Sequence, residues 1–187
     1  MQKKYNIAVV GATGNVGREI LQILEQRNFP INKIYCLASI RSKGKKLDFK
    51  NQQITVEDLS NFDFSNVQIG LFSPGSTVSA EYVPEASKKG CLVIDNTSYF
   101  RMHEDVPLVV PEVNGSVLHD FFKNDNRSNI ISNPNCSTIQ MVVALKPLHD
   151  MSIINRIVVS TYQSVSGKGK GAMDELFEQT KNIYANK

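Results

Sequence analysis

Cys136 is the residue of this chain that most plainly suggests covalent chemistry. It follows the turn Asn-Pro-Asn at 133–135 and precedes a run of helical character from Ser137 to Lys146. A thiol at a helix N-terminus has its thiolate stabilised by the helix dipole and by nearby N–H groups. Such a thiolate beside a nicotinamide can attack an aldehyde, release hydride to the cofactor and hold the acyl group as a thioester. An arbitrary cysteine is more often buried and inert, but this position favours a nucleophile.

The other cysteines and the histidines give weaker signals. Cys36 and Cys91 lie inside apolar strand patterns and are most simply small buried residues. His103 lies in a charged loop, and His119 and His149 lie near expected helix ends, where a basic group needs no catalytic explanation. We assign none of them as a general base, and no cluster has the spacing of metal ligands, so we expect no metal site.

Gly11, Gly14 and Gly17 form a second motif, at the junction between a short apolar run and a helical pattern. Glycine lets the backbone approach a pyrophosphate closely, and the helix N-terminus that follows offers N–H groups to it. The spacing is G-x-x-G-x-x-G rather than the commoner G-x-G-x-x-G. The motif favours a dinucleotide site; the alternative is a tight strand-to-helix turn in a protein that binds no nucleotide.

The segment 38–46 (Ala-Ser-Ile-Arg-Ser-Lys-Gly-Lys-Lys) bears on which dinucleotide would bind. An NAD site usually carries an acidic residue after its second strand, but no acidic residue lies between Leu37 and Leu47. A carboxylate there would repel a 2′-phosphate, whereas Arg41 and two hydroxyl groups can hold one. The segment therefore favours NADP. The alternatives are a solvated basic loop or, less favoured because no aromatic residues interleave, a nucleic-acid patch.

The elements that must position these residues alternate between strand and helix along the chain. We expect helices from Val16 to the Phe29-Pro30 pair and at 77–89, 137–146 and 172–186. We expect strands at 5–10, 33–38, 54–56, 67–72, 91–94, 129–132 and 153–162, with an extended segment at 107–111. This alternation predicts an α/β fold, a Rossmann-like doubly wound parallel sheet with helices on both faces.

A domain boundary is expected near Pro134, where nucleotide-type units give way to a longer strand and a new loop. We therefore expect an NADP-binding domain at 1–133 and, at 134–187, the beginning of a second α+β catalytic and dimerisation domain. One strand and two helices bury little core alone, so the second domain is expected to be incomplete in this chain.

The composition is that of an ordinary globular protein. The 187 residues are 41% hydrophobic and 21% charged, with 21 basic against 18 acidic side chains. These values argue against disorder, collagen-like repeats and coiled coil, and the charge is too slight to suggest nucleic acid as the main partner. No secretory signal or membrane-spanning run is found. Three scattered cysteines make no disulfide framework, so the cytoplasm is the simplest compartment.

Several long segments resemble aspartate-semialdehyde dehydrogenase, specifically its bacterial-type members. They are GATGNVGRE from Gly11, LASIRSKGK from Leu37, IDNTSYFRMHEDVPLVVPEVN from Ile94, SNPNCSTIQMVVALKPLHD from Ser132 and STYQSVSGKGKGAMDEL from Ser160. Two related families differ at the nucleophile. N-acetyl-glutamyl-phosphate reductase is expected to have Gly where this chain has Asn135, and glyceraldehyde-3-phosphate dehydrogenase is expected to read Ser-Cys-Thr-Thr-Asn.

The resemblance implies a reaction and its site residues. The reaction is the reversible, NADP-dependent reductive dephosphorylation of L-aspartyl-4-phosphate to L-aspartate 4-semialdehyde, which leads toward lysine, threonine, methionine and diaminopimelate. For the cofactor, the resemblance implies contacts from the glycine turn, the basic segment and a later loop: Gly11, Thr13, Gly14, Asn15, Val16, Arg41, Ser42, Ser166 and Gly167.

For the substrate, the resemblance implies that Cys136 is the acyl-thioester nucleophile and that Gln163 orients the substrate and the thioester. Arg101 would bind the phosphate that leaves or attacks, since a guanidinium fork matches two phosphate oxygens. The bland alternative for Arg101 is a surface ion pair with Glu104 or Asp105.

The family's chains are about twice as long, with the general-base histidine and the substrate-carboxylate arginine in the second half. We therefore expect an N-terminal portion of a larger enzyme, a homodimer when full length. The portion alone would be nearly inactive, since loss of a general base typically lowers rates about 10²–10⁴-fold. The alternatives are a non-catalytic NADP-binding module, against which Cys136 and Gln163 count, and N-acetyl-glutamyl-phosphate reductase activity.

Overall fold

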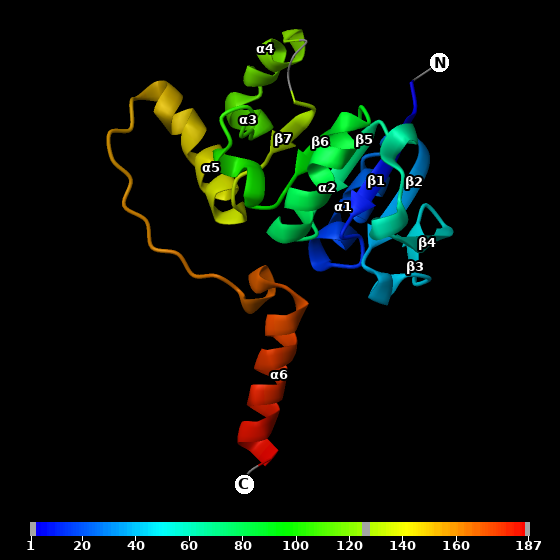
Figure 1. The fold of residues 1–187 in the computed structure, drawn as a ribbon. Helices are drawn as coiled ribbons and strands as arrows, with labels where there is room; N and C mark the ends of the chain where they lie inside the picture. The colour runs from blue at the N-terminus through cyan, green and yellow to red at the C-terminus, as the bar shows by residue number, and fades with distance from the viewer. Residues whose placement is uncertain (1–2, 125–127, 186–187) are drawn as a thin grey trace. The chain divides into compact units, whose positions relative to one another are not determined.

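The structure is a computed structural model that describes residues 3–124 and 128–185. The chain forms two compact units, Met1–Ile154 and Asn155–Lys187, each of which is described by itself (Figure 1). The expected boundary near Pro134 is not tested by this division and stays a prediction.

The first unit is built on one sheet of seven strands in the described residues (Figure 1). The strand order is β3-β4-β2-β1-β5-β6-β7, and every neighbouring pair is parallel except β3 and β4. The strands are β1 (Tyr5–Val10), β2 (Ile31–Ala38), β3 (Lys46–Phe49), β4 (Gln52–Asp58), β5 (Ile69–Phe72), β6 (Leu92–Asp95) and β7 (Ile130–Ser132). The predicted parallel α/β sheet is confirmed.

The central strand β1 shows why helices cover both faces of this sheet. Its residues Ile7 and Val9 belong to one buried cluster, while Ala8 and Val10 belong to the other. A strand buried on both faces reads as a continuous apolar run rather than an alternating one. The helix α1 (Asn15–Gln26) adds Leu21 to the first cluster, and α2 (Ser76–Lys88) adds Val83 and Ala86 to the second. The architecture is therefore a doubly wound, three-layer sandwich.

The switch in winding direction lies at β1, whose two neighbours are β2 and β5. The chain leaves β1 through α1 to reach β2 on one side, and the later strands continue from β5 on the other. In open α/β sheets a crevice opens at the carboxyl ends of the strands at such a point, and ligands bind there.

The remaining helices of the described residues are α3 (Pro111–Asn114), α4 (Val117–Lys123), α5 (Cys136–Met151) and α6 (Lys170–Ala185). The helix expected at 137–146 instead begins at Cys136 and runs through Pro147 to Met151. A proline in a helix removes one N–H and its hydrogen bond, while the bonds of the turns on either side remain. The last helix ends at Ala185 in the described residues, and Asn186, included in the expected range, lies outside them.

The sequence patterns missed the antiparallel hairpin of β3 and β4, of which only 54–56 was expected as a strand. The two strands meet in the pair Lys50-Asn51, and both residues have positive φ angles, 46° and 60°. A two-residue hairpin turn of type I′ needs positive φ at both central positions, and Asn-Gly is its usual signature. The turn was missed because its first position holds Lys50, a residue type that rarely adopts positive φ.

The strand expected at 153–162 is wrong, because residues 153–164 have no regular secondary structure. A strand forms only where a neighbouring strand supplies hydrogen-bond partners, and no described strand pairs with this segment. The second unit consists instead of an irregular segment, a 3₁₀ turn η5 (Val165–Lys168) and α6. None of the helices in the described parts of the chain is long and apolar enough to cross a bilayer.

Candidate active site

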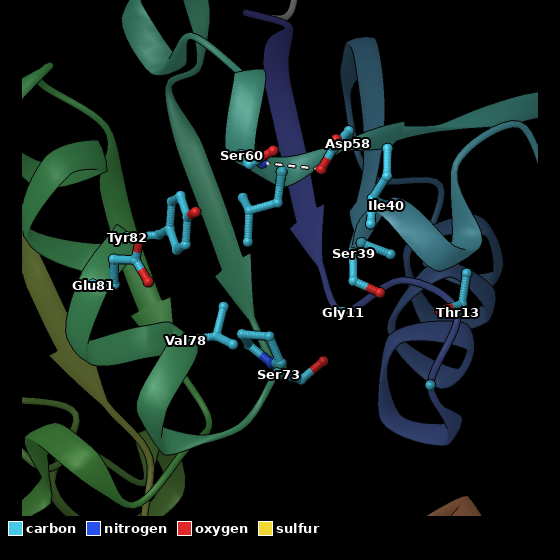
Figure 2. A pocket seen from close by; sticks show the side chains of 14 residues that line it. Gly11, Thr13, Ser39, Ile40, Asp58, Ser60, Ser73, Val78, Glu81 and Tyr82 are labelled. Atoms are coloured by element: carbon cyan, nitrogen blue, oxygen red, sulfur yellow. Dashed lines mark hydrogen bonds between the residues drawn. The ribbon is translucent and has the colours of Figure 1, made fainter.

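A cavity of about 500 Å³ opens at the carboxyl ends of the central strands (Figure 2). It lies wholly within the first unit, and residues from the ends of β1, β2, β4 and β5 and from α2 surround it. The lining residues are Gly11, Thr13, Gly14, Ala38, Ser39, Ile40, Asp58, Leu59, Ser60, Ser73, Pro74, Val78, Glu81 and Tyr82. The cavity therefore stands at the switch point of the sheet, where the glycine motif predicted a dinucleotide site.

The glycine turn is shaped by two close backbone approaches. Gly11 has a φ of +83°, and a Cβ there would lie 2.8 Å from the carbonyl oxygen of Ser73 at the end of β5. A Cβ at Gly17 would lie 2.3 Å from the carbonyl oxygen of Gly11. Gly14 is the N-cap of α1 and supplies no side chain to the helix end. The turn thus presents bare backbone and the first N–H groups of α1 to the cavity.

The loop after β2 brings hydroxyl and ammonium groups to the glycine turn. The Ser42 hydroxyl, in the 3₁₀ turn η1 (Ile40–Ser42), lies 3.5 Å from the Thr13 hydroxyl. The Lys45 ammonium group lies 3.5 Å from the same Ser42 oxygen. Arg41 is exposed and lies outside the cavity lining. Sequence reasoning found Thr13, Arg41 and Ser42 but not Lys45, whose place depends on the turn at Gly44.

Two carboxylates in the cavity wall, Asp58 and Glu81, escaped the sequence analysis. Asp58 ends β4 and stands beside Ala38 of β2 in the register of the sheet. It is only 8% exposed, and its two oxygens accept hydrogen bonds from the Ser60 N–H (3.2 Å) and the Asn61 amide (3.3 Å). This carboxylate is therefore paired within its own turn, one strand farther from the glycine turn than the acidic residue of an NAD site.

The rest of the cavity wall is largely apolar. Ile40 and Leu59 follow the ends of β2 and β4, while Val78 and Tyr82 come from successive turns of α2 (Figure 2). Such an apolar lining favours contact with the flat ring of a heterocyclic base over contact with water. Sequence reasoning missed these residues, although Ile40 and Leu59 lie just after strand ends and Val78 lies in the first turn of α2, where the fold predicts a binding crevice.

Cys136 is the first residue of α5 and is exposed. Asn135 caps the helix, and its side-chain oxygen accepts hydrogen bonds from the N–H (3.0 Å) and the hydroxyl (2.7 Å) of Ser137. The Cys136 sulfur donates to the same oxygen at 3.8 Å. The thiol therefore stands at the N-terminus of a 16-residue helix, as the sequence predicted.

The other two thiols are in a different environment. Cys36 and Cys91 are both fully buried in β2 and beside β6. Burial raises the pKa of the Cys91 thiol to about 12, and burial with the nearby Glu57 charge raises the pKa of the Cys36 thiol to about 11. Both are protonated at neutral pH, so Cys136 is the accessible nucleophile among the three.

Arg101 follows β6 and Cys136 follows β7. These strands are parallel neighbours, so both residues come after the carboxyl ends of adjacent strands. Its Nε donates to the carbonyl oxygen of Asn133 at 2.8 Å, and its Nη2 donates to that of Asn96 at 3.1 Å. It forms no ion pair with Glu104 or Asp105, both of which the structure describes. The surface ion pair is therefore not what holds this side chain.

The second unit brings together the three remaining predicted site residues. A Cβ on Gly167 would lie 2.3 Å from the amide nitrogen of Gln163, so the glutamine side chain packs directly over this glycine. The Gly167 N–H donates to the Ser164 carbonyl, and the hydroxyls of Ser164 and Ser166 are 3.0 Å apart. Gln163, Ser166 and Gly167 thus form one compact turn.

No group of three or more His, Cys, Asp or Glu side chains among the described residues could hold a metal ion. His103 packs against the rings of Tyr99 and Phe100, with centroids 5.3 and 5.1 Å away. The aromatic packing of His103 gives it a structural explanation and leaves the general base unassigned.

Comparison with known proteins identifies the chain's relatives. The family described as semialdehyde dehydrogenase, NAD binding domain, matches residues 6–121, and the corresponding dimerisation domain matches residues 145–187. A curated aspartate-semialdehyde dehydrogenase of Rickettsia bellii is 56% identical over 98% of this chain and 53% of its own length. The chain spans about half the length of the curated relatives it matches.

Solved structures agree with these matches. The crystal structure of aspartate semialdehyde dehydrogenase II complexed with ASA from Vibrio cholerae has a TM-score of 0.92 and 48% identity, over 99% of this chain and 54% of that one. An aspartate semialdehyde dehydrogenase with NADP from Candida albicans has a TM-score of 0.64 and 25% identity, over 81% and 48%. The chain therefore belongs to the semialdehyde dehydrogenase family.

Proposed function

We propose that this chain is the cofactor-binding and nucleophile-bearing portion of an NADP-dependent aspartate-semialdehyde dehydrogenase. The observation that carries the proposal is an exposed cysteine at the start of α5, in the same compact unit as a cavity lined by a glycine turn. The high identity to relatives of that name supports the substrate. Asn135 before the nucleophile separates the chain from N-acetyl-glutamyl-phosphate reductases, which are expected to have glycine there.

The residues present fit a dinucleotide. Bare backbone at Gly11 and Gly14 leaves room for a pyrophosphate, which side chains at these positions would narrow. Asn15 and Val16 begin α1, so their N–H groups belong to the positive end of that helix. Thr13 and Ser42 offer adjoining hydroxyls to the ribose and its 2′-phosphate, with Arg41 as the cation. When bound, NADPH supplies hydride to the acyl carbon.

In the reductive direction the Cys136 thiolate attacks the carbonyl carbon of the aspartyl phosphate. The C–O bond to phosphate breaks, phosphate leaves with that electron pair, and an acyl thioester remains on Cys136. Reduction of the thioester would give the oxyanion of a thiohemiacetal on Cys136, and its collapse would re-form the carbonyl group, break the carbon–sulfur bond, release the aldehyde and return the thiolate. The helix N-terminus stabilises the thiolate at the beginning and end of this cycle.

The remaining predicted residues have roles around the acyl group. Gln163 orients the substrate and the thioester through its amide, and Ser166 with Gly167 lines the nicotinamide end. Arg101 binds the phosphate group with the guanidinium N–H groups that its two carbonyl bonds leave over.

The full-length protein is proposed to be a cytoplasmic homodimer that acts on small molecules, without nucleic acid or membrane as a partner. The match of residues 145–187 to a dimerisation domain supports the dimer. Three free cysteines suit a reducing compartment.

The proposal can be tested on this chain by measuring thiol acylation and cofactor affinity together. We expect hydroxamate-trappable acylation with aspartyl phosphate that is absent in Cys136→Ser and retained in Cys91→Ala. NADPH should bind more tightly than NADH, and Arg41→Asp should reverse this preference because a carboxylate repels the 2′-phosphate. Tight NADPH binding without acylation would favour a non-catalytic module, and equal affinity for both cofactors would refute the 2′-phosphate site.

A further inference from the structure

We propose that Arg101 is a positioning residue for Cys136. Its guanidinium group ties together the loops that follow β6 and β7, and this tie fixes the turn from which α5 and its cysteine begin. The inference rests on the proposed function only in taking Cys136 as the nucleophile, and it assigns Arg101 a role in the protein without any ligand.

The two hydrogen bonds of Arg101 lie just beyond the last residue pair of β6 and β7, Asp95 and Ser132. β6 ends at Asp95 and β7 at Ser132, and the N–H of Asn133 donates to the Asp95 carbonyl at 2.9 Å. Beyond this bond, no further backbone hydrogen bond joins the segments that follow β6 and β7 in the described residues. Arg101 then bridges them, because its Nε holds the carbonyl of Asn133 and its Nη2 holds the carbonyl of Asn96. A single side chain thus extends the β6–β7 pairing by one residue on each strand.

Only Pro134 and Asn135 lie between Cys136 and Asn133, whose carbonyl group accepts the hydrogen bond from Arg101. Pro134 is buried, and its ring fixes φ and removes an N–H that could otherwise anchor the turn. Asn135 is extended, with φ −60° and ψ 147°, and caps α5. The turn therefore has few internal degrees of freedom, and the orientation of the Asn133 peptide is passed directly to the first turn of α5.

The β6 side of the tie is rigid. Asp95 is fully buried, and its carboxylate accepts bonds from the Ser79 hydroxyl (3.0 Å), the Thr97 N–H (3.1 Å) and the Thr97 hydroxyl (2.8 Å). Asn96 lies between these two fixed residues. The Asn96 carbonyl group is consequently well fixed, and by binding it Arg101 is positioned to hold the Asn133 carbonyl group in the loop after β7.

The turn before Cys136 has no comparable side-chain anchor of its own. The Ser132 hydroxyl and the Asn133 side-chain oxygen are both buried and find no hydrogen-bond partner among the described residues. In the part of the chain that the structure describes, Arg101 is thus the side chain that donates to this turn from outside it. A lysine could not replace it, because a single ammonium on a flexible stem does not reproduce a planar fork aimed at two carbonyls.

The test is the rate at which a small alkylating reagent modifies Cys136 in the chain without cofactor, substrate or phosphate. Peptide mass analysis would separate Cys136 from the buried Cys36 and Cys91. The variants are Arg101→Leu, Arg101→Lys and Arg101→Ala, with Arg27→Leu as the matched loss of an exposed arginine at the end of α1. Thermal unfolding would show which variants remain folded.

We expect both Arg101→Leu and Arg101→Lys to slow alkylation at neutral pH by roughly tenfold. Each variant loses a hydrogen bond from the guanidinium group to a backbone carbonyl, so the turn that positions the Cys136 thiol is no longer fixed. Free guanidinium ion at low concentration should restore the rate in Arg101→Ala. Arg27→Leu should alkylate like the unaltered chain.

Two results would overturn the inference. Unchanged alkylation in Arg101→Leu would show that the turn needs no tie. Full retention of the rate in Arg101→Lys would show that only the positive charge matters, and this variant also decides the case if Arg101→Leu does not fold. Neither result would bear on the proposed reaction, because thiol acylation by aspartyl phosphate is measured separately.

Discussion

The carbonyl oxygen of Gly11 occupies the place where a side chain on Gly17 would begin, since a Cβ at position 17 would lie only 2.3 Å from it. The same Cβ would come 2.7 Å from the Cα of Ala12. Both neighbours are backbone atoms of the turn after β1, and they cannot move aside as a flexible side chain can. The third glycine of the motif thus lets α1 start directly against the turn that borders the cavity.

Gly17→Ala should therefore destabilise the first unit by about 1–3 kcal/mol, the usual range for overpacking at a closely packed site. Urea unfolding would measure the loss. Gly171→Ala provides the control, because this glycine lies in the exposed helix α6 with no atom within 4 Å of its Cβ position. A Gly17→Ala chain as stable as the Gly171→Ala chain would show that the turn yields easily.

Lys45→Gln should weaken NADPH binding roughly threefold to tenfold and leave NADH binding unchanged. The reason is that the Lys45 ammonium group lies beside the Ser42 hydroxyl, which in turn adjoins the Thr13 hydroxyl, where the 2′-phosphate is proposed to bind. The effect should shrink as ionic strength rises, since the group is exposed. Fluorescence titration with each cofactor would measure both affinities.

Lys43→Gln is the matched control for this prediction, because it removes the same charge from the same loop. Lys43 borders a different depression, beside Glu57 and Asn61. Equal losses of NADPH affinity in the two variants would mean that the loop acts only through its overall charge.

Stability should fall as pH rises from about 9 to about 12, because folding suppresses the ionisation of Cys91. Burial raises its pKa from 9.0 to about 12, so in this window the unfolded chain has lost a proton that the folded chain retains. The stabilisation is fully present below pH 9, and it is lost by about 1.4 kcal/mol per pH unit as the pH rises.

The measurement is the slope of unfolding free energy against pH for the unaltered chain and for Cys91→Ala. Other groups titrate in the same range, so the difference between the two slopes is the quantity that matters. A variant whose stability declines as steeply as that of the unaltered chain would contradict the prediction.

Asp95→Asn should lower the free energy of unfolding by about 2–3 kcal/mol, because the buried carboxylate accepts three hydrogen bonds and an amide would turn a donor toward other donors. Thermal and urea unfolding would detect this. Asp48→Asn, on the exposed side of β3, should change stability little. If the two variants behaved alike, the Asp95 contacts would contribute nothing net.

Local patterns were sufficient for the elements whose signals lie within a few residues. The apolar run of β1 followed by three glycines gave the first strand, turn and helix, because backbone geometry at such a junction depends on neighbouring residues. Cys136 at a helix start was likewise predicted, since an Asn cap and a helical run stand on either side of it. The family resemblance from the quoted segments is confirmed by the matched family domains.

Where partners are distant, the sequence was insufficient. The strand expected at 153–162 has a suitable pattern, but a strand exists only through hydrogen bonds to a neighbour that the pattern does not contain. The β3–β4 hairpin was missed for the opposite reason, because Lys50 takes a positive φ that its residue type does not announce.

The sequence by itself determined the thiol at a helix start and the bare glycine turn, since both can be read from adjacent residues. Only the tertiary structure decided which distant groups join them. Parallel strands bring their carboxyl ends to one edge, so Asp58 and Tyr82 come to line the glycine cavity and Arg101 comes to span the loops after β6 and β7. The order of strands in the sheet, which no local pattern encodes, determines which of these residues lie close together.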